Sequence, residues 1–115
     1  FIMIGHLLFK NIDPQNPSTT SSILLNDILR TEFNYDGLLI SDDMNLIQRS
    51  TGSSYRKLII DSLNAGMDIL LYVGLPDSSE KMISVVTQAL ESGELKEQEI
   101  NNKVLRIMLA KRDLL

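Results

Sequence analysis

Residues 35–44 decide the fold, and they read Tyr-Asp-Gly-Leu-Leu-Ile-Ser-Asp-Asp-Met. Turn residues up to Gly37 lead into a short, continuously apolar run that ends at two carboxylates. Such a run is typical of a strand buried on both faces, as the strands of a parallel sheet are. We therefore predict a strand over residues 38–40, directly followed by Asp42 and Asp43.

Two further apolar runs predict strands on either side of this one, over residues 1–5 and 68–73. The spacing of apolar residues predicts four helices, one after each strand and one at the end of the chain. Their ranges are 23–33, 58–66, 82–90 and 100–115, and Ser21 or Ser22 is the expected N-cap of the first. Segments rich in Gly, Pro, Ser and polar residues are predicted loops: 10–22, 48–54 and 74–79.

Strands that alternate with helices predict an α/β fold with a parallel sheet, in which the carboxyl ends of the strands share one rim. His6, Asp42 and Gly74 each follow a predicted strand and are expected at that rim. Three strands cannot close a barrel, and a (β/α)8 barrel needs about 250 residues. We therefore predict that residues 1–115 form a single partial domain, the C-terminal part of a TIM (β/α)8 barrel with about three βα units and a closing helix.

Composition excludes several classes of function. Eleven basic residues against fifteen acidic ones give a net charge of -4, which argues against nucleic acid as a partner. The absence of cysteine excludes disulfides and thiolate metal sites. No apolar run approaches the roughly 20 residues of a membrane span, so we expect a protein without membrane partners, in the cytoplasm.

Asp42 is the candidate for covalent chemistry, because a strand end holds a side chain rigidly at the face where barrel enzymes build their sites. Retaining glycoside hydrolysis needs such a carboxylate, aligned with the anomeric carbon and roughly 5 Å from a partner acid. Carboxylates after strands also serve as helix caps and loop anchors, and spacing alone leaves both interpretations open.

The motif over residues 35–44 resembles the nucleophile strand of family-3 glycoside hydrolases. Its surroundings are similar to the same family in five places: residues 3–6, 12–19, 28–30, 65–71 and 104–107. The resemblance covers nearly the whole chain, and it favours the β-N-acetylhexosaminidase branch. It implies that Asp42 is the nucleophile of a retaining mechanism, whereas Asp43 matches a position that varies between aspartate and alanine.

The resemblance also implies a substrate, terminal β-linked N-acetylglucosamine in cell-wall muropeptide recycling, with no metal or organic cofactor. His6, Asp43 and Met44 are then expected to line or support the sugar pocket. The family's general acid/base lies on an earlier loop of the barrel, in a motif that this chain does not contain. We therefore expect the isolated chain to be inactive.

Two other interpretations stay open. The stretch from residue 38 to 45 also resembles the phosphoacceptor strand of receiver domains, although the acidic pair and the lysine of those domains are missing. Alternatively, the chain is a noncatalytic remnant that covers its open sheet edges by pairing with the missing N-terminal part of the barrel or with another copy. A metal site is disfavoured because His6 and Asp42 supply too few ligands.

Three remaining features are assigned structural roles. Asp13-Pro14 is expected to shape a loop, and Asp68, on the rim opposite the site, is expected to contribute stability. The charges over residues 91–99 and 103–113 are expected to be solvated helix faces.

Overall fold

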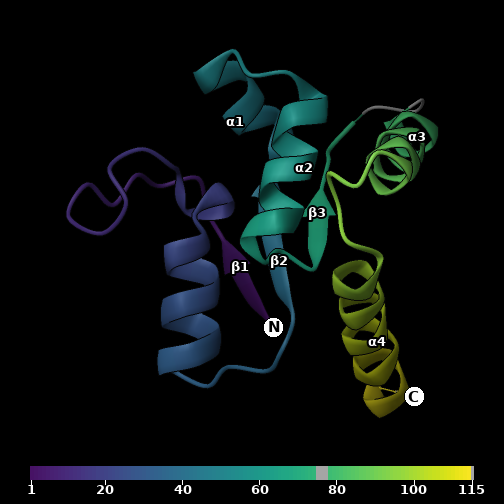
Figure 1. The fold of residues 1–115 in the computed structure, drawn as a ribbon. Helices are drawn as coiled ribbons and strands as arrows, with labels where there is room; N and C mark the ends of the chain where they lie inside the picture. The colour runs from purple at the N-terminus through teal and green to yellow at the C-terminus, as the bar shows by residue number, and fades with distance from the viewer. Residues whose placement is uncertain (75–77, 115) are drawn as a thin grey trace.

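The computed structural model describes residues 1–74 and 78–114. Its centre is a three-stranded parallel sheet in the order β1 (Ile2–Ile4), β2 (Leu39–Asp43) and β3 (Ile69–Leu71). The middle strand β2 is the segment that the apolar run predicted, extended by three residues so that Asp42 and Asp43 end it. Figure 1 shows the three strands side by side and pointing the same way.

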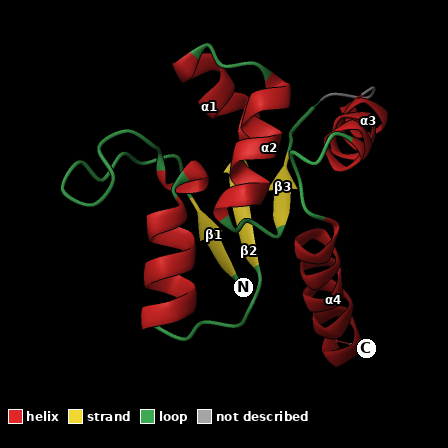
Figure 2. Ribbon diagram, viewed as in Figure 1, coloured by secondary structure: helices red, strands yellow, loops and turns green. Residues whose placement is uncertain are grey.

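Helical segments follow each strand, as predicted, and the described residues contain two more than the four predicted. They are η1 (Ser18–Thr20), η2 (Ile23–Glu32), α1 (Met44–Thr51), α2 (Tyr55–Ala65), α3 (Ser78–Glu91) and α4 (Glu97–Leu114). In Figure 2, α2 lies over the sheet, with η2 on the side of β1 and α3 and α4 on the side of β3. No helix in the described part of the chain is long and apolar enough to cross a bilayer.

The core lies between the sheet and the helices that cover it. Leu25 of η2, Leu39 of β2, and Ala65 and Met67 from the α2–β3 connection form one buried cluster. Gly66, the C-cap of α2, has a φ of 119°, a conformation that glycine adopts without strain. The predicted helix stop at Gly66 is thus confirmed.

The predicted loop over residues 48–54 is wrong in its first half. The structure shows a helix there, α1, which begins directly at the strand end and runs to Thr51. Asp43 caps its N-terminus, and Met44 and Ile47 bury its inner face. Only residues 52–54 form the loop, which starts at Gly52 with a φ of 68°.

Other boundaries shift by a few residues, because strand and helix ends depend on pairing and capping. The outer strands are shorter than predicted, at three residues each. The first helix is a π-helix, closed at its end by a hydrogen bond from the Phe33 amide to the Ile28 carbonyl. Most of the predicted turn over residues 74–79 lies outside the described residues, and α3 begins at Ser78.

The loop between β1 and η2 is organised by Asp13, as predicted. Its buried carboxylate accepts hydrogen bonds from the Ser21 hydroxyl at 2.8 Å and from the amides of Gln15 and Asn16. The pKa of Asp13 is lowered, chiefly by the Ser21 hydrogen bond. Of the two expected caps, Ser22 directly precedes η2 but makes no capping hydrogen bond through its side chain, whereas the Ser21 hydroxyl accepts from the Leu24 amide.

Asp68 lies at the amino end of the sheet and is buried by cationic partners. Its Oδ2 accepts from Arg30 at 2.6 Å and from the Leu39 amide at 2.9 Å, and its Oδ1 accepts two hydrogen bonds from Arg106. These contacts tie η2, β2 and α4 to the start of β3. They support the structural role predicted for Asp68.

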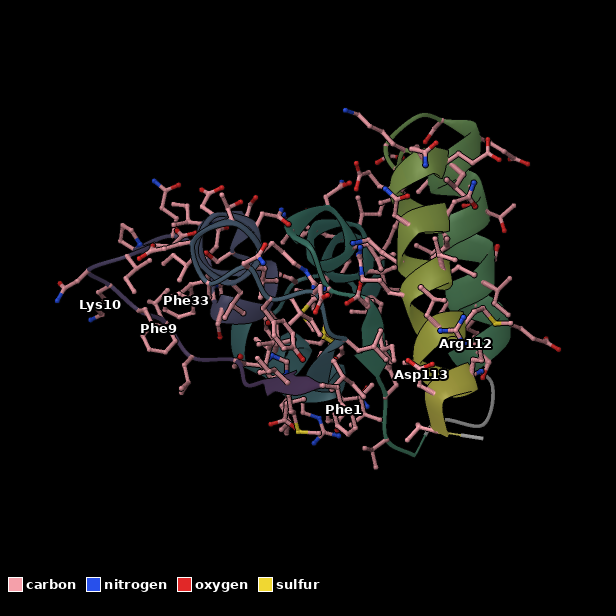
Figure 3. The ribbon with its side chains drawn as sticks, turned by 90° about the horizontal axis from the view of Figure 1, so that it is seen from below. Phe1, Phe9, Lys10, Phe33, Arg112 and Asp113 are labelled. Atoms are coloured by element: carbon pink, nitrogen blue, oxygen red, sulfur yellow. The ribbon has the colours of Figure 1, made fainter. Side chains whose placement is uncertain are left out.

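Figure 3 shows the molecule from below, with the long loop after β1 on one side and α4 on the other. Phe9 and Lys10 lie on the loop that reaches away from the sheet, Phe1 lies at the start of β1, and Arg112 and Asp113 lie on α4 (Figure 3). Phe1 and Phe33 are exposed at 86% and 65%, so apolar surface remains on the β1 side of the sheet.

Candidate active site at the carboxyl ends of the strands

Asp42 lies at the carboxyl end of β2, the middle strand of the sheet. Its side chain is half-buried, and its Oδ1 accepts a hydrogen bond of 2.7 Å from the amide of Asp43. The adjacent Ser41 is fully buried, and its hydroxyl accepts from the Leu71 amide where the pairing of β2 and β3 is irregular. The backbone on which Asp42 stands is therefore held by both the sheet and the next helix.

Asp43 is the N-cap of α1. Its Oδ1 accepts from the amide and the side-chain amide of Asn45, and also from the amide of Val73 beyond the end of β3. Desolvation acts to raise the pKa of Asp43, but the hydrogen bonds from Asn45 and Val73, with help from the charge of Arg49, outweigh it and lower the pKa. The carboxylate is thus held ionised as a structural anchor between two strand ends.

Asn45 extends this anchor into the helical layer. Its side-chain amide donates to the Val73 carbonyl at 3.1 Å, and its Oδ1 accepts from the Tyr55 hydroxyl of α2. Asn45 is buried, so these contacts are shielded from water. The position of Asp42 therefore depends on a network that joins β2, β3, α1 and α2.

His6 joins the first strand end to the same network. Its Nε2 lies 2.9 Å from the Asp43 carbonyl, and its Nδ1 lies 3.0 Å from the Thr19 hydroxyl. A carbonyl only accepts, so Nε2 carries a proton and donates to the Asp43 carbonyl, and the Thr19 hydroxyl holds the other ring nitrogen. His6 thus holds the carbonyl of Asp43, the residue that follows Asp42, and its predicted role in a sugar pocket stays a prediction.

Met44 has a different environment from the other predicted site residues. Its side chain is fully buried, in a cluster with Ile47 and Leu58. In this structure it fixes α1 against α2 and offers no surface to a ligand. Substrate contact by His6, Asp43 or Met44 stays a prediction.

The strand ends come together as predicted, since His6 and Val73 both bond to Asp43. Sequence reasoning missed the partners Thr19, Asn45 and Val73. An Asp-x-Asn pair at a helix start is a local capping signal that identifies Asn45. No local signal identifies Thr19 or Val73, because their contacts span 13 and 30 residues.

No group of three or more His, Cys, Asp or Glu side chains suited to a metal ion occurs among residues 1–74 and 78–114. At the strand ends, the Oδ1 oxygen of Asp43 is already occupied by three N–H donors. The arrangement therefore presents Asp42 as a half-buried carboxylate on a rigid backbone, which suits nucleophilic attack on a carbon centre.

Parallel strands with a rigid carboxylate at their common rim are the arrangement of sites in α/β proteins, barrels and open sheets alike. The family model described as glycosyl hydrolase family 3 N terminal domain matches residues 1–110. The chain belongs to this family. Membership confirms the resemblance found in the sequence and removes the receiver-domain interpretation.

Named relatives agree with this assignment. A β-hexosaminidase of Shewanella frigidimarina is 37% identical over 70 residues, which is 61% of this chain and 20% of the relative. The chain spans about a fifth to a quarter of the length of the curated relatives it matches. The whole enzyme is therefore much longer than this segment in those organisms.

Solved structures show the same fold. A family-3 β-N-acetylglucosaminidase from Paenibacillus sp. str. FPU-7 is 27% identical with a TM-score of 0.88, over 96% of this chain and 21% of that one. The β-N-acetylglucosaminidase from Thermotoga maritima is 26% identical with a TM-score of 0.84, over 92% and 23%. These matches confirm the predicted α/β fold as part of a TIM barrel.

Proposed function

We propose that this chain, as a single partial domain, supplies the nucleophile segment of a retaining β-N-acetylhexosaminidase. The observation that carries the proposal is Asp42, half-buried at the end of the middle strand, on a backbone fixed by Asp43 and His6. The relatives named β-hexosaminidase and β-N-acetylglucosaminidase supply the class of substrate. The reaction is hydrolysis of a terminal β-linked N-acetylglucosamine.

In this mechanism an Asp42 carboxylate oxygen forms a bond to the anomeric carbon while the glycosidic carbon–oxygen bond breaks. The leaving oxygen takes a proton from an acid that another part of the barrel provides. Water then attacks the glycosyl ester, releases the sugar and returns the carboxylate. The short bond from the Asp43 amide to Oδ1 suits this role, because it orients the carboxylate, and Oδ2 accepts no hydrogen bond from residues 1–74 and 78–114.

The chain carries the nucleophile but not the acid, so the isolated chain is expected to be inactive. The test compares this chain with a longer protein that adds the preceding strands of the barrel, using p-nitrophenyl N-acetylglucosaminide as substrate. Activity is expected only in the longer protein, and Asp42→Asn abolishes it. Hydrolysis that survives Asp42→Asn at the parental rate refutes the proposal.

Asp36→Asn is the matched control for this test. Asp36 is an exposed aspartate on the turn before β2, at the opposite end of the same strand. The substitution makes the same isosteric change in charge, and it is expected to leave the rate in the longer protein unchanged. Equal losses in both variants would trace the effect to net charge instead of to the nucleophile.

The proposal extends to the pathway and the cellular compartment in which the reaction takes place. The resemblance to β-N-acetylhexosaminidases supports a role in peptidoglycan recycling in the cytoplasm, where muropeptides supply the substrate. Activity of the longer protein on a disaccharide muropeptide tests this choice. Turnover of the chromogenic glycoside without any release of N-acetylglucosamine from the muropeptide would contradict it.

We also propose that the exposed edge of the sheet pairs with further strands. β1 is an edge of the described sheet; Met3 on it is 55% exposed, and Phe1, directly before it, is 86% exposed. Exposed strand edges with apolar side chains favour pairing with further strands, either of other βα units of a barrel or of a second copy. We expect the isolated chain to associate in light scattering, and a stable monomer at high concentration contradicts this.

A further inference from the structure

A polar cavity of about 530 Å³ lies at the other end of the molecule from Asp42. It is bounded by η2, the end of α2 and the first turns of α4. Four cationic side chains and one carboxylate line it, together with uncharged residues: Arg30, Lys96, Lys103, Arg106, Glu99, Asn26, Asn64, Leu63 and Gly66. Its lining is thus cationic, in a chain whose net charge is -4.

Two of the four cations already have an anionic partner. Arg30 and Arg106 share the carboxylate of Asp68, with N–O distances of 2.6 and 2.7 Å. Arg30 also donates to the carbonyls of Tyr35 and Gly37, so its guanidinium is largely occupied. Asp68 in turn accepts from Arg30, Arg106 and the Leu39 amide, and it is saturated with donors.

Lys103 has no such partner. It is 5% exposed, yet within residues 1–74 and 78–114 it makes neither a salt bridge nor a hydrogen bond through its side chain. The predicted solvated helix face over residues 103–113 is therefore wrong at Lys103, whose side chain is mostly buried. Burial lowers the pKa of Lys103, and the negative charge of Asp68 opposes that effect only in part.

The burial of Lys103 concerns chiefly its alkyl stem, because its Nζ is not among the fully enclosed side-chain atoms that lack a hydrogen-bond partner. The ammonium therefore reaches the open space of the cavity. Glu99, one turn earlier on α4, attracts Lys103 but forms no salt bridge with it in the described structure. Arg106 keeps Nη1 free of hydrogen bonds in the same part of the chain, since Asp68 takes only Nε and Nη2. Donors therefore remain on both side chains.

We propose that this cavity binds a phosphate group, held by Lys103 and Arg106 with Lys96 at its exposed mouth. A phosphate accepts several charge-assisted hydrogen bonds at once, which matches a lysine and an arginine side by side on one helix. The cavity also has room for a sugar attached to the phosphate. The free anion and a sugar phosphate are therefore both candidate sources of the group, and the proposal does not depend on the reaction at Asp42.

The test is calorimetric titration of the chain with inorganic phosphate and, separately, with a hexose 6-phosphate. Saturable binding is expected in at least one arm, and the stronger arm identifies the source of the group. Lys103→Met keeps the length of the side chain and suits a buried position. It is expected to weaken binding roughly tenfold or more, as the loss of one charge-assisted hydrogen bond implies.

Lys111→Met is the matched control, because Lys111 is an exposed lysine near the other end of α4. Lys111→Met is expected to leave the affinity for phosphate unchanged. Asp42→Asn is a second control, because it would change the affinity only if the phosphate bound at the strand ends, and it is also expected to leave the affinity unchanged. A thermal shift on each variant confirms folding, and phosphate is expected to raise the Tm of the parent but not that of Lys103→Met. Absence of saturable binding in both arms, equal losses in the two lysine variants, or a loss in Asp42→Asn overturns the proposal.

Discussion

Substitution of Asp68 by asparagine tests how much the buried ion pairs at the amino end of the sheet contribute to stability. The carboxylate is completely buried and serves two arginines and the amide of Leu39. Asparagine keeps the shape of the side chain but removes the charge, and its amide group directs a donor at a guanidinium. The substitution therefore leaves Arg30 and Arg106 without their anion at the start of β3.

The loss in the free energy of unfolding can be estimated from how exposed the two arginine partners of Asp68 are. Removing one member of a buried ion pair costs about 3–5 kcal/mol. The side chains of Arg30 and Arg106 are 17% and 31% exposed, so water partly resolvates them after the substitution. We therefore expect a loss near the lower limit, about 3 kcal/mol, which corresponds to a fall in Tm of roughly 10 °C for a domain of this size.

Urea unfolding followed by circular dichroism measures this loss. Asp113→Asn is the control, because Asp113 pairs with Arg112 at the exposed end of α4, where both side chains are mostly in water (Figure 3). The control is expected to change stability by no more than about 0.5 kcal/mol. A loss below about 1 kcal/mol for Asp68→Asn, or one equal to that of the control, would refute the reasoning.

Three further predictions concern other contacts. Asp43→Ala is expected to lower the free energy of unfolding by about 1–2 kcal/mol in urea, because the cap of α1 and the hydrogen bond from the Val73 amide are lost. Asp43→Asn retains most of the cap and is expected to lose less. Equal losses in the two variants would contradict this. Glu94 has its pKa lowered from 4.5 to about 2 by the hydrogen bond from Arg56, so its stabilising effect is fully present above pH 4.5 and is lost as the pH falls toward 2. The difference in stability between the parent and Glu94→Gln should shrink over that window, and a constant difference argues against the bond. Gly66→Ala is expected to lower the Tm, since φ is 119° and a Cβ would lie 2.6 Å from the Asn26 side-chain oxygen; an unchanged Tm would show that this backbone adapts.

The strands and their order could be predicted because continuous apolar runs between turn residues leave few alternatives. Leu39 and Ile40 could be assigned to a buried strand from their neighbours alone, and the position of Asp42 followed from the length of that run. Gly66 marked a helix end for an equally local reason. The candidate nucleophile was thus accessible to sequence reasoning.

Features that depend on distant partners were not accessible. α1 was missed because residues 48–51 are polar and its stability comes from the Asp43 cap and from Met44 and Ile47 packed against α2. The burial of Lys103 was missed because a helical pattern does not show which charged position faces η2 and Asp68. The Asp43 cap is a local contact, but the packing of α1 on α2 and the burial of Lys103 depend on the tertiary fold, about which periodicity carries no information.

The central claim is that Asp42 forms a covalent bond to the sugar. The most direct measurement incubates the longer protein with an N-acetylglucosamine-type fluorosugar that traps the glycosyl intermediate, and then maps the modified peptide by mass spectrometry. A single sugar attached to Asp42 is the predicted result, with no adduct in Asp42→Asn. A sugar found on another side chain, or an active enzyme that accumulates no adduct at Asp42 under trapping conditions, would contradict the account.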